Sequence, residues 1–227
     1  MNELHLFAGA GGGILAGQML GHRCVCAVEW EPYAQAVLVA RQNDGSLPPF
    51  PIWDDVQTFD GRPWRGIVDI VAGGFPCQAY STAAAGKNTA DDLWPEMRRI
   101  VADVAPRYVF AENVQRRAID RAADDLQAMG YAVRCMQLAA SDLGADHIRR
   151  RYWLLAHADM HCELHRRINA EVAVSPRIYS GVWQAEPDES RMVDGLAFGV
   201  ERLRATGNGQ VPQCAATAFR HLSAAFE

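Results

Sequence analysis

The chain has 227 residues, 49% of them hydrophobic and 22% charged, which is typical of one globular domain with a sizeable core and excludes disordered and collagen-like classes. Twenty-two basic and 27 acidic residues give a net charge of −5. Taken as a whole, that charge argues against a partner held by bulk electrostatics, such as nucleic acid.

No apolar run approaches the roughly 18 residues that a membrane span needs, and the first residues lack the basic start of a secretory signal. We therefore expect a cytoplasmic protein that does not interact with membranes. The six cysteines include no C-x-x-C pair, so neither a disulfide framework nor a metal site is expected. Most of them should be small buried hydrophobic residues.

Short apolar runs alternate with helical patterns over the first two thirds of the chain. The predicted elements are a strand at 4–7, a helix at 13–20, a strand at 24–29, a helix at 32–42, a strand at 67–72, a helix at 95–104, a strand at 108–111, a helix at 115–129, and strands at 131–138 and 152–158. This alternation predicts an α/β fold with a doubly wound, mostly parallel, Rossmann-like sheet.

The alternation stops after about residue 157. Residues 159–193 mix charges, prolines and aromatic residues without a clear period, and only residues 211–226 again resemble a helix. We predict three parts: a domain over 1–158, an irregular segment over 159–193, and a C-terminal part over 194–227 that returns to the first domain.

A glycine cluster, F-A-G-A-G-G-G at residues 7–13, follows the first predicted strand and opens the first helix. Glycines there let the backbone approach a ligand at the positive end of the helix. Glu29 ends the second strand, where an acid commonly accepts hydrogen bonds from ribose hydroxyls. The glycines alone also fit a tight connection, but together with Glu29 they predict an adenosine-like ligand.

A stiff turn, Gly73-Gly74-Phe75-Pro76-Cys77-Gln78, follows the strand predicted at 67–72. Ligands of open α/β sheets bind beyond the carboxyl ends of the strands, so Cys77 should face the crevice. A buried structural thiol is the ordinary alternative, and it fits poorly with the two glycines, the proline and the polar loop that follows.

Two more groups of charged residues flank predicted strands. Glu112 projects from a carboxyl end, where partial burial would raise its pKa and let it donate a proton. The alternative is a helix cap, which Asn113 alone could supply. Arg149 and Arg151 should share one face of an extended segment, although a solvated basic run is also an ordinary reading of that pattern.

Together these motifs resemble those of the DNA (cytosine-5) methyltransferases. The matches, in the family's order, are Phe7-x-Gly9-x-Gly11-Gly12, Pro76-Cys77-Gln78, Glu112-Asn113-Val114, Arg149-x-Arg151 and Gly207-Asn208-x-x-Val211-Pro212, which correspond to motifs I, IV, VI, VIII and X. Five ordered matches span nearly the whole chain. The resemblance implies a doubly wound methyltransferase sheet with a C-terminal helix packed back on the catalytic domain.

The resemblance also implies a mechanism. The cytosine of double-stranded DNA is flipped out of the duplex, and the Cys77 thiolate adds to ring carbon 6. Glu112 protonates or hydrogen-bonds ring nitrogen 3, so that carbon 5 takes the methyl group of S-adenosylmethionine. A base then removes the carbon-5 proton and the thiol is eliminated. Arg151 would contact the cytosine carbonyl, and Arg149 would support it or bind a phosphate.

The implied contacts divide into cofactor and DNA sets. The cofactor set is Phe7 and Trp30 at the adenine, Gly9 and Gly11 at the methionine, Glu29 at the ribose, Asp55 at the adenine amino group, and Pro76 and Asn208 around the pocket. Asp54 is an alternative to Asp55, either of them could cap a turn, and Trp30 could be a packed surface aromatic. The DNA set is Gln78, Ser81 and Lys87 in the loop after Cys77, with Arg166, Arg167, Arg177, Tyr179 and Trp183 in the segment 159–193.

Two features depart from the family pattern. Asp146-His147 stand where the family usually has Pro-Gln before the arginine pair, and only about 35 residues (159–193) are available for target recognition. Readout of a base sequence needs several side chains in the major groove, so short or relaxed specificity is expected. The alternative is a truncated enzyme or one that depends on a helper protein. We expect a monomer, and a cognate restriction enzyme stays open.

Resolved along the chain, the charge allows a nucleic-acid partner. Residues 1–60, 61–156 and 157–227 carry net charges of −5, +2 and −2, from 2 basic and 7 acidic, 13 and 11, and 7 and 9 side chains. The arginines of the middle part predict a local basic cleft: Arg98, Arg99, Arg116, Arg117, Arg121 and 149–151.

Three other functions are compatible with parts of the pattern. A tRNA cytosine-5 methyltransferase would use the same chemistry. A nicotinamide-dependent oxidoreductase explains Phe7 to Glu29 but gives no role to Cys77 or Glu112. A non-catalytic nucleic-acid-binding relative is disfavoured because every residue that the chemistry needs is present.

Overall fold

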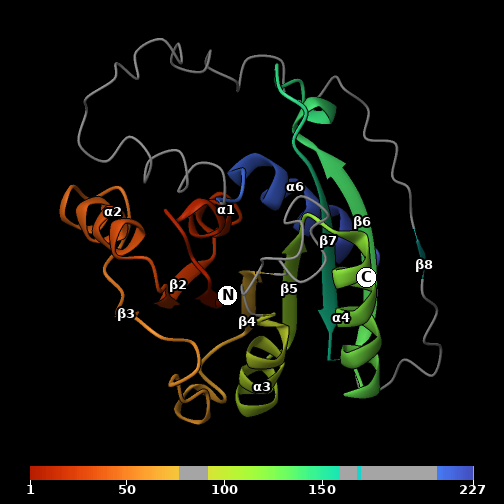
Figure 1. The fold of residues 1–227 in the computed structure, drawn as a ribbon, viewed down its shortest axis with the longest axis horizontal. Helices are drawn as coiled ribbons and strands as arrows, with labels where there is room; N and C mark the ends of the chain where they lie inside the picture. The colour runs from red at the N-terminus through yellow and green to blue at the C-terminus, as the bar shows by residue number, and fades with distance from the viewer. Residues whose placement is uncertain (77–91, 159–167, 170–208, 227) are drawn as a thin grey trace, which may run out of the picture.

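The computed structural model describes residues 1–76, 92–158, 168–169 and 209–226. In this part of the chain one sheet is covered by helices on both faces (Figure 1). Its strands lie in the order β3-β2-β1-β4-β5-β7-β6-β8. This order, with helical connections between parallel strands, confirms the predicted doubly wound α/β fold.

The described elements alternate nearly as the sequence predicts. The strands are β1 (Asn2–Leu6), β2 (Arg23–Val28), β3 (Ile52–Trp53), β4 (Ile70–Gly74), β5 (Tyr108–Asn113), β6 (Ala132–Ala139), β7 (Arg150–His157) and β8 (Ile168–Asn169). The helices are α1 (Gly12–Met19), α2 (Pro32–Asn43), α3 (Trp94–Val104), α4 (Arg116–Ala128) and α6 (Pro212–Ser223).

The sheet is parallel from β3 to β5, and β7 then runs antiparallel to both β5 and β6. Tyr108, at the start of β5, pairs with His157 at the end of β7, and Asn113 pairs with Tyr152. The first residues of β7 therefore lie at the edge where β1, β4 and β5 end.

Some boundaries differ from the sequence predictions. The strand predicted at 67–72 begins at Ile70, because residues 65–67 form a turn and Asp69 a bend. The Asp69 carboxylate accepts a 2.7 Å hydrogen bond from the backbone amide of Asn2. The two-residue strand β3 was not predicted, since so short a strand has no detectable alternation. The strand predicted at 152–158 begins two residues earlier, at Arg150.

Two hydrophobic layers join the helices to the sheet. On one face, α3 and α4 bury residues three or four apart, including Met97 and Ile100 on α3 and Ile119 and Leu126 on α4. On the other face lie α1, α2 and α6, and α6 packs against α1, β6 and β7. Of the segment 159–193, only β8 is among the described residues.

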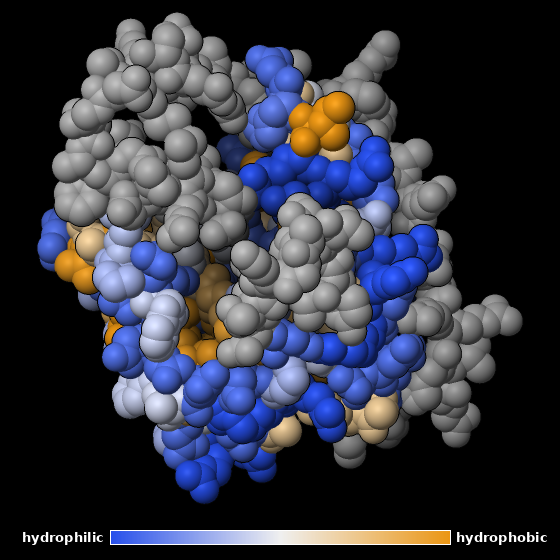
Figure 2. All heavy atoms as spheres, viewed as in Figure 1, coloured by the Kyte–Doolittle hydropathy of each residue, from blue (hydrophilic) through white to orange (hydrophobic). Residues whose placement is uncertain are grey.

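Hydrophilic residues cover most of the described surface in the view of Figure 2. Within the described residues, no helix combines the length and the apolar composition that crossing a bilayer requires.

Candidate active site

The predicted site residues that the structure describes come together at one edge of the sheet. Leu6, at the end of β1, pairs with Gly73 of β4, and Gly74 pairs with Glu112 of β5. The glycine turn after β1, the Pro76 turn after β4 and the carboxyl of Glu112 are thus neighbours, as expected for strands that end at the same edge.

The Glu112 carboxyl is buried and paired. Its residue is 6% exposed, and its Oε1 atom forms a 2.9 Å ion pair with Nε of Arg151. Burial raises the pKa of this carboxyl, while the charges of Arg151 and Arg149 and the amide of Gln210 act in the opposite direction. The raised pKa agrees with the predicted effect of burial and suits Glu112 to donating a proton or a hydrogen bond.

Asn113 links the turn before Cys77 to β5. Its Nδ2 atom donates a 2.9 Å hydrogen bond to the Phe75 carbonyl, and its Oδ1 atom accepts one of 2.9 Å from the amide of Gln115. Gln115 itself is the N-cap of α4, so Asn113 is not simply a helix cap. The buried Phe75 ring also packs 5.1 Å from Trp94, centroid to centroid. These contacts fix the backbone that leads to Cys77.

The arginine pair shares one side of the chain, as predicted. Arg149 donates from Nη2 to the Gly209 carbonyl at 2.5 Å, and Arg151 contacts Glu112, whereas Arg150 is exposed. The predicted residues Cys77, Gln78, Ser81, Lys87, Arg166, Arg167 and Asn208 lie outside the described residues, as do Arg177, Tyr179 and Trp183.

The glycine turn has an unusual backbone that Glu29 stabilises. Phe7, Gly9 and Gly11 have φ angles of 54°, 55° and 90°, and a positive φ is uncommon for a bulky residue such as Phe7. The Glu29 carboxylate accepts hydrogen bonds from the amides of Gly9 (2.6 Å) and Glu31 (2.8 Å). The structure thus brings Glu29 to the turn, as the sequence predicts.

A small cavity lies between this turn and β4, and glycines form much of its wall. Phe7, Ala8 and Gly9 line one side, and Gly73 and Gly74 line the other. A Cβ atom at Gly73 would lie 2.5 Å from the Leu6 carbonyl oxygen, so no side chain fits there. Trp30, next to Glu29, is 72% exposed and offers a flat apolar surface. The cavity itself, of about 10 Å³, is far smaller than an adenosine-containing cofactor, and neither Glu29 nor Trp30 lines it.

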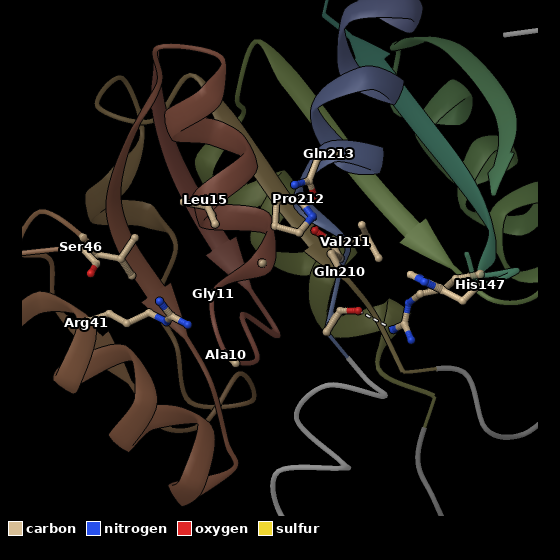
Figure 3. A pocket seen from close by; sticks show the side chains of 14 residues that line it. Ala10, Gly11, Leu15, Arg41, Ser46, His147, Gln210, Val211, Pro212 and Gln213 are labelled. Atoms are coloured by element: carbon tan, nitrogen blue, oxygen red, sulfur yellow. Dashed lines mark hydrogen bonds between the residues drawn. The ribbon is translucent and has the colours of Figure 1, made fainter. Parts of the chain in front are cut away.

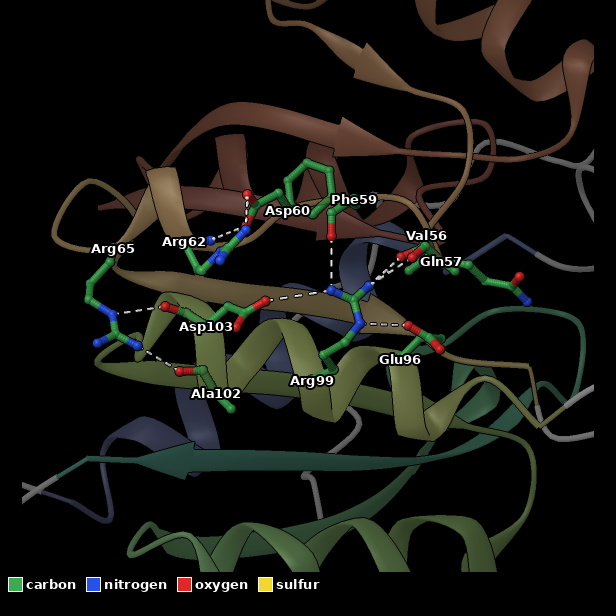
Figure 4. Close-up of polar contacts among 10 residues, drawn as sticks. All are labelled: Val56, Gln57, Phe59, Asp60, Arg62, Arg65, Glu96, Arg99, Ala102 and Asp103. Atoms are coloured by element: carbon green, nitrogen blue, oxygen red, sulfur yellow. Dashed lines mark hydrogen bonds and ion pairs between the residues drawn. The ribbon is translucent and has the colours of Figure 1, made fainter.

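The loop that carries Asp55 is held by Arg99. The Arg99 guanidinium donates to the carbonyls of Val56 (2.8 Å) and Phe59 (2.9 Å), as Figure 4 shows. Asp55 accepts a 2.8 Å hydrogen bond from the Gln57 amide and therefore caps a turn, whereas Asp54 is exposed. The turn-capping alternative is confirmed for Asp55, and a contact with adenine stays a prediction.

Several arginines of the predicted basic cleft are paired with acids. Arg99 contacts this loop and Glu96, Arg121 forms an ion pair with Asp92, and Arg116 lies 3.7 Å from Asp120. These ion pairs offset part of the positive charge of the three arginines, and the basic cleft stays a prediction. At the edge itself the described cations of the motif are Arg149 and Arg151.

Three of the described cysteines are structural, as expected. Cys24, Cys26 and Cys214 are buried, and burial raises the pKa of each thiol, to about 12 for Cys26 and Cys214. Such thiols are poor nucleophiles. Within the described ranges, no cluster of three or more His, Cys, Asp or Glu residues is placed to hold a metal ion.

Gln210 is a site residue that the sequence did not single out. Its backbone carbonyl lies against Gly12, and its Oε1 atom lies 2.5 Å from where a Cβ of Gly13 would be. Its Nε2 atom is buried beside Glu112 without a hydrogen-bond partner of normal geometry in the described part of the chain. The available signal was its place within the motif Gly207-Asn208-x-x-Val211-Pro212, at a position that the motif leaves unspecified.

Comparisons with known proteins identify the family of the chain. Residues 1–185 match the family described as C-5 cytosine-specific DNA methylase. The chain is 32% identical over 164 residues to the Type II methyltransferase M.NgoMIV of Neisseria gonorrhoeae, covering 68% of this chain and 51% of that protein. It is 31% identical over 163 residues to the Type II methyltransferase M.HhaI of Haemophilus parahaemolyticus, covering 67% and 47%.

Solved structures share the fold. DNMT2 of Spodoptera frugiperda has a TM-score of 0.61 at 19% identity, covering 83% of this chain and 61% of that one. A putative DNA modification methyltransferase from an Escherichia coli prophage has a TM-score of 0.54 at 24% identity, covering 69% and 46%. The chain spans about half the length of the two curated relatives. The family match covers most of the chain and includes the Glu112 and Arg151 positions, so the chain belongs to the C-5 cytosine-specific DNA methylases.

Proposed function

We propose that this protein transfers a methyl group from S-adenosylmethionine to carbon 5 of cytosine in double-stranded DNA. The observation that carries the proposal is the buried pair of Glu112 and Arg151, located beside the braced turn that leads into Cys77. A nicotinamide-dependent oxidoreductase would have no role for Glu112 and Arg151. The family match does not support that alternative either.

The residues of the chain divide the chemistry among them. The Cys77 thiolate adds to ring carbon 6 of a flipped cytosine, while Glu112 hydrogen-bonds or protonates ring nitrogen 3. Arg151 holds the Glu112 carboxyl and contacts the cytosine carbonyl. S-adenosylmethionine, when bound, supplies an electrophilic methyl group. Loss of the carbon-5 proton to a base then lets the Cys77 thiol leave, which restores the aromatic ring.

The proposed cofactor contacts surround the glycine turn and the Glu29 carboxylate. Glu29 binds the ribose hydroxyls in addition to the amides that it already accepts from, and Phe7 and Trp30 lie at the adenine. The backbone at Gly9 and Gly11 holds the methionine, with Asp55, Pro76 and Asn208 completing the pocket. The Glu29 carboxylate suits ribose hydroxyls, which can donate hydrogen bonds to it, rather than a phosphate, which it would repel.

The setting of the reaction is also a proposal. We infer a cytoplasmic monomer in which residues 1–158 bind the cofactor, 159–193 form a reduced target-recognition segment and 194–227 return to the catalytic domain. Gln78, Ser81, Lys87, Arg166 and Arg167 contact DNA. A segment as short as 159–193 gives relaxed specificity or needs a helper protein, and a restriction enzyme partner stays open.

The test is covalent trapping on duplex DNA that contains 5-fluorocytosine, in the presence of S-adenosylmethionine. Fluorine at carbon 5 blocks the final elimination, so the protein should remain attached to the DNA through Cys77. Cys77→Ser should form no adduct, and Glu112→Gln should form it much more slowly, while both still bind the cofactor.

Two outcomes would overturn parts of the proposal. An adduct with fluorinated tRNA but none with DNA would assign the protein to the tRNA branch. No adduct with either nucleic acid, from folded protein that binds the cofactor, would remove the catalytic assignment.

A further inference from the structure

A second and larger cavity, of about 390 Å³, lies on the other side of the glycine turn. Its floor is the first turn of α1, at Gly11, Gly12 and Leu15. Gln210, Val211, Pro212 and Gln213 form one wall, next to His147 and Arg149, while Arg41 and Ser46 stand on the opposite side (Figure 3). Of the expected cofactor contacts that the structure describes, only Gly11 lines it, so this cavity differs from the predicted adenosine pocket.

The lining is basic. Arg41 comes from the last turn of α2, whereas His147 and Arg149 precede β7, so these basic residues reach the cavity from two parts of the chain. None of the described residues that line the cavity is Asp or Glu. The nearby Asp44 accepts a 2.8 Å hydrogen bond from the Ser46 amide and lies outside the lining. Amide groups at the start of α1 add partial positive charge.

The cavity adjoins the candidate active site through one residue. Arg149 lines the cavity, donates to the Gly209 carbonyl and also lowers the pKa of Glu112 by its charge. An anion in the cavity would therefore sit close to the reacting base. Arginine is well suited to bind the oxygens of a phosphate, and a phosphodiester bears a single negative charge that these cations can balance.

We propose that this cavity binds one backbone phosphate of the DNA substrate and that Arg41 is a phosphate contact. The inference rests on the proposed function, since it takes DNA as the substrate. Because phosphate contacts orient a nucleic acid without reading its bases, this contact positions the strand on the protein and adds no sequence preference.

The experiment compares Arg41→Gln with Arg23→Gln, a matched change of an exposed arginine at the opposite end of β2. Affinity for a short DNA duplex is measured by fluorescence anisotropy at several salt concentrations, and affinity for S-adenosylhomocysteine is measured separately. Arg41→Gln should reduce the slope of log affinity against log salt by about 0.9 and weaken binding several-fold on every duplex tested. Arg23→Gln should match the wild type, and neither variant should change cofactor affinity.

Three results would overturn the phosphate site. One is an unchanged salt slope in Arg41→Gln, and another is an equal loss in Arg23→Gln. The third is weaker cofactor binding with an unchanged slope, which would assign the cavity to the cofactor's carboxylate. The trapping reaction separates this inference from the proposed function: DNA binding with an Arg41-dependent slope but no adduct would retain the site and remove the catalysis. Failure of the wild type to bind duplex DNA would remove both.

Discussion

The protonation state of Glu112 is set by opposing influences that single substitutions can separate. Burial raises its pKa, and the Arg151 guanidinium 2.9 Å away is the leading influence that lowers it. If Glu112 acts in its protonated form, methyl transfer falls as the pH rises through this pKa. Arg151→Gln should therefore move the fall in rate to higher pH and also slow the reaction about 100-fold, because a charged contact to the base is lost.

The measurement is single-turnover methyl transfer to DNA between pH 5 and 9. Arg150→Gln is the control, because this neighbour is exposed and has no contact with Glu112. If the rate of methyl transfer falls at the same pH in the wild type and in Arg151→Gln, Arg151 does not set the pKa of the catalytic acid.

Gln210 acts on the same carboxyl through its amide, which lowers the pKa of Glu112. Gln210→Met keeps the length of the side chain but removes the donor, so the fall in rate should again move to higher pH, with a loss of about 10-fold. Gln137→Met, the same change at an exposed glutamine on β6, is the control. A slower reaction with an unchanged pH profile would reduce Gln210 to a packing role.

At the scale of elements, α1 needs a glycine at position 17 because the helix packs closely on the Glu3 side chain. A Cβ at Gly17 would meet the Glu3 carboxylate, which is buried under the helix on β1. Gly→Ala in an exposed helix typically stabilises by about 1 kcal/mol, but here Gly17→Ala should destabilise the protein by about 2 kcal/mol. Urea denaturation measures the difference, with Met19→Ala on the exposed side of α1 as the control. A gain in stability would show that Glu3 can move aside.

Local patterns predicted most elements, and contacts between distant residues account for the rest. The helices α3 and α4 were visible because their buried residues recur every three or four positions. Asp69, just before β4, accepts a hydrogen bond from Asn2, and Gln210 reaches the site through its contacts with Gly12 and Gly13. These contacts join residues that are far apart in the sequence, so residue spacing and helix or strand propensity do not predict them.

The motifs predicted the site better than they predicted its surroundings. Glu112, Arg149 and Arg151 were correctly grouped, because strand ends and alternation place them. The partners of Arg99 and Arg121 were not predicted, because the sequence does not reveal which acid or carbonyl each guanidinium reaches.

At the scale of the whole molecule, a buried cluster of Glu3, His5 and His22 makes the free energy of unfolding depend on pH. Glu3 accepts hydrogen bonds from His5 (2.8 Å) and His22 (2.7 Å). Burial alone would raise the pKa of Glu3, but the two histidines lower it from 4.5 to about 2. Since the folded pKa is lower than the unfolded one, the stabilisation is fully present above about pH 4.5 and is lost as the pH falls towards 2.

The shift corresponds to about 3 kcal/mol between these limits. In urea titrations from pH 7 to 3, Glu3→Gln should lower the stability at pH 7 and show a weaker decline below pH 4.5. Glu31→Gln, an exposed acid, should follow the wild type. Equal acid sensitivity in Glu3→Gln and the wild type would assign the decline to other groups.

The antiparallel direction of β7 sets a minimum length for the connection that follows this strand. Because β7 ends at His157, at the edge away from the site, and the chain is again at the site edge at Gly209, residues 159–208 must connect the two edges. Eight residues of β7 span roughly 27 Å at about 3.4 Å each, so a similar number would bridge the gap. The remaining residues of this connection, about 40, are not needed to close the fold. The length and sequence of this part of the connection can therefore vary while the catalytic edge stays the same.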